Sequence, residues 1–397
     1  MVKTPVYMDN HATTRVDPRV LEAMLPYFGE MYGNAGSTTH YFGWAAKTRV
    51  GQARATIAEL LGAKTKEIIF TSGATESNNL ALCGATAKLA GKGKHIISVA
   101  TEHPSVLDPL VKLQRSDFEI TLLPVTQAPE LQAGLITAEQ VDEAVRDDTV
   151  LVSVMLANNE IGAIHPIRRI AEVCRRRGVL LHCDATQAIG KIPVNVDELS
   201  VDLMSFSAHK IYGPKGIGGL YVRSRKPRVR LQSLIDGGGQ EGGLRSGTLN
   251  VPGIMGLARA MELCHEAMPE EPLRLRQLRN RLWEGLTSSL SDVTLNGPAL
   301  DDPKLRLPDN LNVSFGHVDG EALLMSMKDL ALSTGSACSS SNPEPSHVLR
   351  ALGLGHDLTL GSVRFGPGRF NTTEELEFAI ELVTQTVTRL RGMSSLA

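Results

Sequence analysis

Short apolar runs alternate with longer amphipathic stretches along the first two-thirds of this chain, and this alternation constrains the fold more than any other feature. Most of the runs are apolar on both faces, which is typical of parallel strands covered by helices on each side. The predicted strands are 67–70, 95–100, 150–155, 179–183 and 203–206, and helical patterns at 105–115, 137–146 and 168–177 lie between them. The sequence therefore predicts an α/β fold with a mainly parallel central sheet.

The pattern changes after a glycine-rich segment at 236–250. Helical patterns follow at 253–268 and 273–290, then strand candidates at 310–315 and 362–365, and a final helix at 374–390. We expect a large α/β domain over residues 16–260 and a smaller α+β domain formed by residues 1–15 and 261–397.

Composition excludes several classes of protein. Lys plus Arg is 41 and Asp plus Glu is 43, which offers no general electrostatic attraction for nucleic acid or an anionic membrane. No stretch approaches the roughly 20 apolar residues that span a bilayer, and the N-terminus resembles neither a signal nor a transit peptide, so we expect a cytoplasmic protein. None of the five cysteines stands in a C-x-x-C pair, so we expect neither a metal site nor a disulfide framework.

Polar side chains follow the predicted strands at the edge where ligands bind in open α/β sheets. The turn 71–76, which includes Ala74 and Thr75, opens a helix and can offer N–H groups and hydroxyls to a phosphate. The later strand ends carry the segments 101–103, 158–160, 184–187 and 207–210. Any one of these is more often a helix cap or a turn, but together they indicate a site.

These strand ends contain the residue types that one cofactor requires. Lys210 in a protein interior can lose its proton and form a Schiff base, and Asp184 can keep a pyridine nitrogen protonated. With a phosphate cup, this is the set that pyridoxal 5′-phosphate (PLP) needs. Nucleotide sites are less consistent with the sequence, because there is no Walker A motif and the glycines at 216–219 lead into a strand-like run.

Nearly the whole chain, from Tyr7 to about Leu390, resembles the cysteine desulfurases of the class V aminotransferase fold, in the NifS/IscS-like branch. The ordered motifs that carry the resemblance are DNHATT (9–14), TSGATESN (71–78), TEH (101–103), ANNEIG (157–162), HCDATQ (182–187), SFSAHK (205–210), RSGT (245–248) and STGSAC (333–338). The resemblance implies the PLP-dependent transferase fold, of the aspartate aminotransferase type.

The resemblance also implies roles for individual residues. Lys210 would carry the cofactor and move protons, and His103 would stack on the ring and act as acid or base. Arg364 would clamp the substrate carboxylate with its planar fork. The other cofactor contacts would be Asp184 to the pyridinium nitrogen, Gln187 and Asn159 near the phenolic oxygen, Ala74, Thr75, Ser207 and His209 around the phosphate, and Thr248 to the phosphate of a neighbouring subunit. The last contact implies a homodimer with shared active sites.

Cys338 lies in a stretch of small polar residues with Gly and two prolines, which is typical of a loop, at about 333–346. An exposed thiol suits nucleophilic attack on sulfur. The resemblance makes Cys338 the nucleophile that takes sulfur from L-cysteine as a persulfide, releases alanine, and hands the sulfur to an acceptor protein. The length of the loop is similar to that of the IscS-like group.

Other interpretations stay open at this point. Gln240-Glu241 is followed by Gly242, where many relatives have Arg, and the chain ends at Ala397 without the tail that docks an iron–sulfur scaffold. The acceptor could serve iron–sulfur assembly, tRNA thiolation, nitrogenase or DNA phosphorothioation. The alternative functions are a selenocysteine lyase or related aminotransferase, and a sulfur-relay scaffold that acts only through binding.

Overall fold

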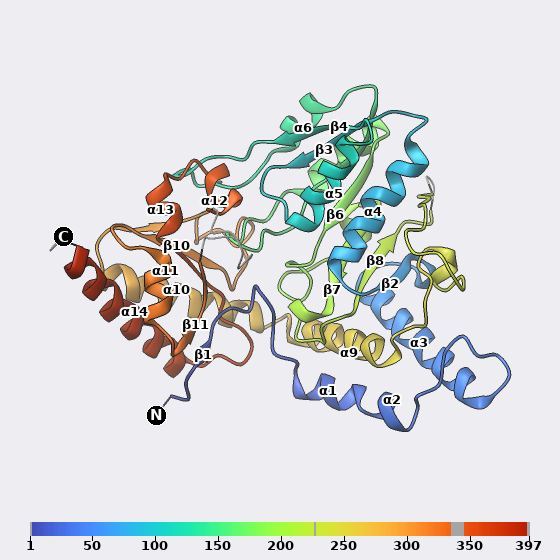
Figure 1. Cartoon of the computed structure of the whole chain (residues 1–397), viewed down its shortest axis with the longest axis horizontal. Helices are drawn as coiled ribbons and strands as arrows, with labels where there is room; N and C mark the ends of the chain where they lie inside the picture. The colour runs from blue at the N-terminus through green and yellow to red at the C-terminus, as the bar shows by residue number, and fades with distance from the viewer. Residues whose placement is uncertain (1, 226–227, 335–344, 395–397) are drawn as a thin grey trace.

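A seven-stranded sheet forms the centre of the computed structural model, which describes residues 2–225, 228–334 and 345–394 (Figure 1). The strand order is β2-β8-β7-β6-β5-β3-β4. The strands are β2 (Ile68–Thr71), β3 (His95–Val99), β4 (Glu119–Leu123), β5 (Thr149–Ser153), β6 (Leu180–Asp184), β7 (Leu203–Ser207) and β8 (Gly218–Val222). Strands β3 to β7 run parallel, whereas β8 runs antiparallel to both β2 and β7. The predicted α/β class with a mainly parallel sheet is confirmed.

The strands of the sheet are almost entirely buried, apart from edge strand β4, because helices pack on the sheet. The helices of this part are α1 (Pro18–Met24), α2 (Pro26–Gly29), α3 (Tyr41–Leu60), α4 (Ala74–Leu89), α5 (Pro104–Gln114), α6 (Ala138–Ala144), α7 (Ile167–Arg177), α8 (Val196–Leu199) and α9 (Val251–Ala267). Figure 1 shows α4 and α5 on one face of the sheet and α9 with α3 near its β2 end. The buried faces of α3, α7 and α9 join one large apolar core.

A second apolar core lies in the C-terminal part of the chain, where α10 (Glu271–Ser289) packs against α14 (Thr373–Ser394). An antiparallel sheet of order β12-β13-β10-β9 completes this part. The remaining elements are β9 (Val293–Leu295), β10 (Leu311–Phe315), α11 (Gly320–Ser326), β11 (Leu330–Ala331), β12 (Ser333–Thr334), α12 (His347–Ala351), α13 (His356–Leu360) and β13 (Ser362–Phe365).

The N-terminus joins this C-terminal part. Strand β1 (Val6–Tyr7) pairs in parallel with β11, and the chain then crosses to α1 (Figure 1). This arrangement is consistent with the expected grouping of residues 1–15 with the smaller domain, although the boundary near residue 260 falls inside α9. The division of the chain into domains stays a prediction.

None of the helices in the described ranges combines the length and the apolar character that crossing a membrane requires.

Candidate active site

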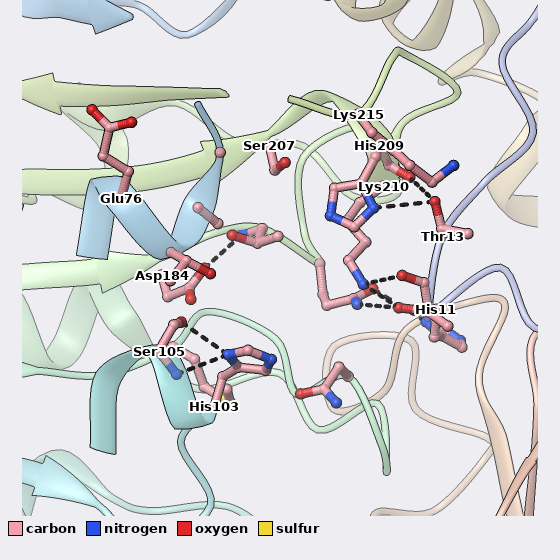
Figure 2. Close-up of a pocket in the computed structure, with 18 of the residues that line it drawn as sticks. His11, Thr13, Glu76, His103, Ser105, Asp184, Ser207, His209, Lys210 and Lys215 are labelled. Atoms are coloured by element: carbon pink, nitrogen blue, oxygen red, sulfur yellow. Dashed lines mark hydrogen bonds between the residues drawn. The ribbon is translucent and has the colours of Figure 1, made fainter. Parts of the chain in front are cut away.

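A cavity of about 620 Å³ opens at the carboxyl ends of β6 and β7, where the strand-end residues converge (Figure 2). The segment 11–13 and Arg364 on β13 close its other side. The residues singled out from the sequence that line the cavity are Ala74, Thr75, His103, Asn159, Asp184, Gln187, Ser207, His209, Lys210 and Arg364. Figure 2 shows Lys210 reaching toward His11, across the cavity from Asp184 and His103.

Asp184 ends β6 and is held at both carboxylate oxygens. Its Oδ2 accepts a hydrogen bond of 2.7 Å from Asn78 Nδ2 on α4, and its Oδ1 accepts one of 2.9 Å from the backbone N–H of Thr186. The side chain is almost fully buried, yet it borders the cavity. Two donors therefore orient a carboxylate toward the cavity, where it can pair with a cationic ring nitrogen.

His103 caps the N-terminus of α5, and Ser105 determines which ring nitrogen carries the proton. Nδ1 accepts from the Ser105 backbone N–H at 3.1 Å and lies 2.8 Å from Ser105 Oγ. Because Asn78 donates to that same Oγ at 2.8 Å, the hydroxyl is free to donate to Nδ1. The proton of the neutral ring therefore sits on Nε2. Burial lowers the pKa of His103 more than the nearby Asp184 carboxylate raises it, so the ring is neutral at pH 7.

The N-terminus of α4 forms a cradle for an anion. Among the described residues no side chain caps this 16-residue helix, so its first N–H groups are open to the cavity beside Thr75. A side chain at Gly73 would place a Cβ 3.7 Å from Ser207 Oγ, which shows how closely the hydroxyl faces the turn. His209 and Lys215 complete the cradle. Burial, followed by Lys210 and Lys215, lowers the pKa of His209 to about 4.

Lys210 and Gln187 share a backbone acceptor in the DNHATT segment. Lys210 Nζ donates to the His11 carbonyl at 2.5 Å and to the Ala12 carbonyl at 2.7 Å. Gln187 Nε2 donates to the same His11 carbonyl at 2.8 Å. The N-terminal segment therefore positions the lysine and the amide together.

Arg364 is buried on β13 and connects the cavity to the start of the segment that leads to Cys338. Its Nη1 donates to the Asn159 carbonyl at 3.1 Å, and its Nη2 donates to Asp9 Oδ1 at 2.6 Å and to Ser333 Oγ at 3.0 Å. Its Nε is buried without a partner among the described residues. A buried guanidinium with unused N–H groups beside a cavity suits a carboxylate ligand.

Two of the predicted site residues are not part of the cavity in the described structure. Thr248 is exposed and does not line it, and Cys338 lies outside the described residues. Sequence reasoning assigned no role to His11, Asn78 or Ser105, which position the other side chains. His11 lies in the DNHATT motif and Asn78 in the TSGATESN motif. Their place in these motifs is the sequence feature that could have identified them as site residues.

The residues present fit PLP. The cavity offers a lysine, a carboxylate for a ring nitrogen, an open helix N-terminus for a phosphate, and a buried Thr186 hydroxyl that has no partner among the described residues. This is the donor set that PLP requires, and the groups surround one space rather than several.

Comparison with known proteins supports the same conclusion. The aminotransferase class-V family matches residues 6–378. The chain belongs to this family. It is a PLP-dependent enzyme. A cysteine desulfurase IscS from Anaeromyxobacter dehalogenans (strain 2CP-C) is 54% identical over 395 residues, covering 100% of this chain and 95% of that protein.

Two solved structures have the same fold as this chain. A NifS-like protein superposes with a TM-score of 0.88 at 38% identity, covering 97% of this chain and 99% of that one. SspA in complex with cysteine superposes with a TM-score of 0.79 at 35% identity, covering 92% and 99%. The resemblance deduced from the motifs is thus confirmed over the whole chain.

Proposed function

We propose that this enzyme is a cysteine desulfurase that converts L-cysteine to L-alanine and captures the sulfur as a persulfide on Cys338. The observation that carries the proposal is the convergence of Lys210, Asp184, His103 and Arg364 on one cavity from four separate parts of the chain. The relatives named above are a cysteine desulfurase and a protein solved with cysteine, which supports the choice of substrate.

PLP supplies an electron sink, which makes the substrate Cα–H acidic and weakens its Cβ–S bond. Asp184 would hold the ring nitrogen, and Gln187 and Asn159 would contact the phenolic oxygen. Ala74, Thr75, Ser207 and His209 would hold the phosphate. Lys210 would hold the cofactor and would move the substrate proton to and from Cα. His103 would act as acid or base through Nε2, since Ser105 occupies Nδ1. Arg364 and Asn159 bind the substrate carboxylate.

The described residues on either side of segment 335–344 support attack by Cys338. Before the segment, Ser333 pairs in register with Arg364 and donates from Oγ to Asp9 at 2.9 Å. After it, His347 Nε2 lies 2.8 Å from the carbonyl of Glu102, the neighbour of His103. Ser333 and His347, which flank the segment, are therefore bonded to Asp9 and to the neighbour of His103.

The sulfur step balances without another reagent. The Cys338 thiolate forms an S–S bond to the substrate sulfur, the Cβ–S bond breaks, and its electron pair goes to the carbon side. Cβ then takes up a proton, so L-cysteine and a thiol become L-alanine and a persulfide. The persulfide sulfur passes to an acceptor protein, in iron–sulfur cluster assembly or in other sulfur trafficking such as tRNA thiolation.

A homodimer with shared active sites is part of the proposal. Aromatic side chains gather on the exposed surface of the segment around α2 and the start of α3, where the Tyr32 and Phe42 rings stack at 5.3 Å. Phe28, Tyr41 and Trp44 are also more than half exposed. An exposed aromatic cluster of this kind is typical of an interface. Thr248, which is exposed and outside its own cavity, would then reach the partner's phosphate site.

We also place the reaction in the cytoplasm, where a reducing environment keeps thiols available for persulfide chemistry. The four described cysteines are free thiols.

The test is alanine released from L-cysteine in the presence of a reductant, comparing the PLP-loaded enzyme with Cys338→Ser. Cys83→Ser is the matched control, because Cys83 is a partly exposed thiol on α4 away from the cavity lining. We expect many turnovers in the parent and in Cys83→Ser, and almost none in Cys338→Ser. Equal alanine from all three would remove Cys338 from the mechanism and favour a lyase. No alanine from any of them would contradict desulfuration and favour a binding role.

A further inference from the structure

A buried polar cluster borders the cavity at two of its residues and extends from there into the protein. It consists of His11, Gln187, Lys191 and Asp309, and all four side chains are more than 90% buried. Lys191 follows Gln187 by four residues, and Asp309 comes from the segment before β10. Buried charges are costly unless they are paired and hydrogen-bonded, so this cluster calls for an explanation.

The ammonium of Lys191 has three N–H groups, and the cluster offers three acceptors. Lys191 Nζ lies 2.9 Å from Asp309 Oδ2, 3.0 Å from His11 Nδ1 and 3.0 Å from Gln187 Oε1. The side chain is therefore saturated, and each N–H direction is assigned to one neighbour.

These contacts determine where the hydrogen atoms lie on His11 and Gln187. His11 Nδ1 must accept from Lys191, so its proton sits on Nε2, which lies 3.2 Å from the Asp309 carbonyl. Burial, followed by the charge of Lys191, lowers the pKa of His11 to about 3, which agrees with a neutral ring. Gln187 Oε1 must also accept from Lys191, because an ammonium can only donate. His11 Nδ1, 3.2 Å from Oε1, has no proton to donate to it.

The amide of Gln187 is thereby held in one of its two orientations. Its oxygen faces Lys191, and its Nε2 uses one N–H on the His11 carbonyl at 2.8 Å. Among the described residues the other N–H has no acceptor, and Gln187 borders the cavity. A flipped amide would place its oxygen against the His11 carbonyl and its NH2 group against the Lys191 ammonium. Both hydrogen bonds would then be lost.

We propose that Lys191, neutralised by Asp309, is a positioning residue that holds Gln187 with an N–H donor toward the phenolic oxygen of PLP. This inference rests on the proposed placement of PLP in the cavity. A donor at that oxygen stabilises its ionised form, so Lys191 acts on the cofactor through Gln187 without touching it. Two further charged groups act on the cluster: Arg364, near His11, and Arg279, near Asp309.

The experiment follows the absorbance of bound PLP as a function of pH in the absence of substrate, for the parent and for Lys191→Met. Without the ammonium, the Gln187 amide can turn its oxygen toward the cofactor, so the ionised phenolic oxygen loses a donor. We expect the midpoint of the absorbance change to rise by about one pH unit, and PLP to bind about tenfold more weakly. Lys191→Gln, which keeps an N–H donor but carries no charge, is the test if Lys191→Met does not fold, and we expect a rise of the midpoint in the same direction.

The control is Arg223→Met, which breaks a partly buried ion pair with Asp202. Asp202 precedes β7, whereas the cavity lies at the other end of that strand. We expect Arg223→Met to lower the melting temperature while leaving the midpoint of the PLP absorbance unchanged. If Lys191 only supported the fold, Lys191→Met would likewise lower the melting temperature and leave the midpoint unchanged.

A double-mutant cycle decides whether Lys191 acts through Gln187. We expect Lys191→Met to shift the midpoint in the parent and to add no shift in a Gln187→Ala background. An unchanged midpoint in the single variant, or equal shifts in both backgrounds, would overturn the inference. A parent that does not bind PLP would instead overturn the proposed function, and the inference with it, so the two failures are distinguishable.

Discussion

Arg364 shows how a single residue can look like a structural ion pair and still serve the substrate. It bonds Asp9, Ser333 and the Asn159 carbonyl, which explains its burial, but it also borders the cavity. A guanidinium bound only for stability would have no reason to line the cavity that holds Lys210 and Asp184.

We expect Arg364→Lys to weaken binding of L-cysteine about 10- to 100-fold, because a lysine keeps the charge but not the planar set of donors. Binding is measured through the change in PLP absorbance on adding ligand. Cysteamine, which lacks the carboxylate, should bind parent and variant alike. Arg389→Lys, on the outward side of α14, is the control. Equal losses for cysteamine and L-cysteine would show that Arg364 supports the fold rather than the carboxylate.

At the scale of elements, α4 connects two parts of the site. Its open N-terminus faces the anion cradle, and Asn78, just over one turn later, donates both to Asp184 and to Ser105. Since Ser105 holds His103, one side chain on one helix positions both the acid and the imidazole.

We expect Asn78→Ala to weaken PLP binding about 5- to 10-fold, because Asp184 loses a buried donor. Asn79→Ala is a matched control on the same helix, since Asn79 Nδ2 donates to the Thr75 carbonyl and to no other group among the described residues. PLP affinity can be measured by titrating apoenzyme and following cofactor absorbance. Similar losses in both variants would mean that the effect comes from the helix and not from Asp184.

The elements differ in how well sequence predicts them. Strands β3, β5, β6 and β7 lie within a residue or two of the predicted ranges, because they are buried on both faces and read as continuous apolar runs. Strand β4 was not predicted. It is an edge strand with mixed exposure, so its sequence, EITLL, lacks both the continuous apolar pattern and a clean alternation.

At the scale of the whole molecule, the exposed aromatic cluster predicts self-association. We expect sedimentation equilibrium at micromolar concentration to give about twice the 42.8 kDa of one chain. Trp44→Asp should shift the protein toward the monomer, because it places a charge in the apolar patch. Leu131→Asp, at an exposed leucine elsewhere, should leave the mass unchanged. A monomeric parent would contradict the proposed dimer and the role of Thr248 in it.

Buried histidines predict how stability depends on pH. Burial lowers the pKa of His11 to about 3 and those of His165 and His182 to about 4. In the unfolded chain each titrates near 6.5, so below that pH the unfolded state binds more protons than the folded state. The free energy of unfolding should therefore fall as the pH drops from 6.5 toward 4, by up to about 2 kcal/mol per histidine at pH 5.

The measurement is urea unfolding at several pH values between 5 and 8. Glu102 and Asp202 oppose the trend, since burial raises the pKa of each carboxyl and their contributions are lost as the pH rises. The lowered pKa values of His95, His103 and His209 add to the trend.

His165→Gln keeps an acceptor for the Ile136 N–H. Near pH 5.5 it should reduce the slope of the unfolding free energy against pH by the equivalent of about one proton. An unchanged slope in this variant would show that His165 does not titrate as proposed.

The sequence by itself determined the fold class, the family and most of the residues around the cavity. Apolar periodicity is a local property of the chain, and the polar residues that follow each strand meet because parallel strands end at one edge of the sheet. Only the tertiary structure decided which side chains position the others. Lys191 and Asp309 lie more than 100 residues apart, and their contact with Gln187 depends on how the C-terminal part packs against the sheet. No local pattern records such a contact, because a buried ion pair forms only when two distant segments exclude water together.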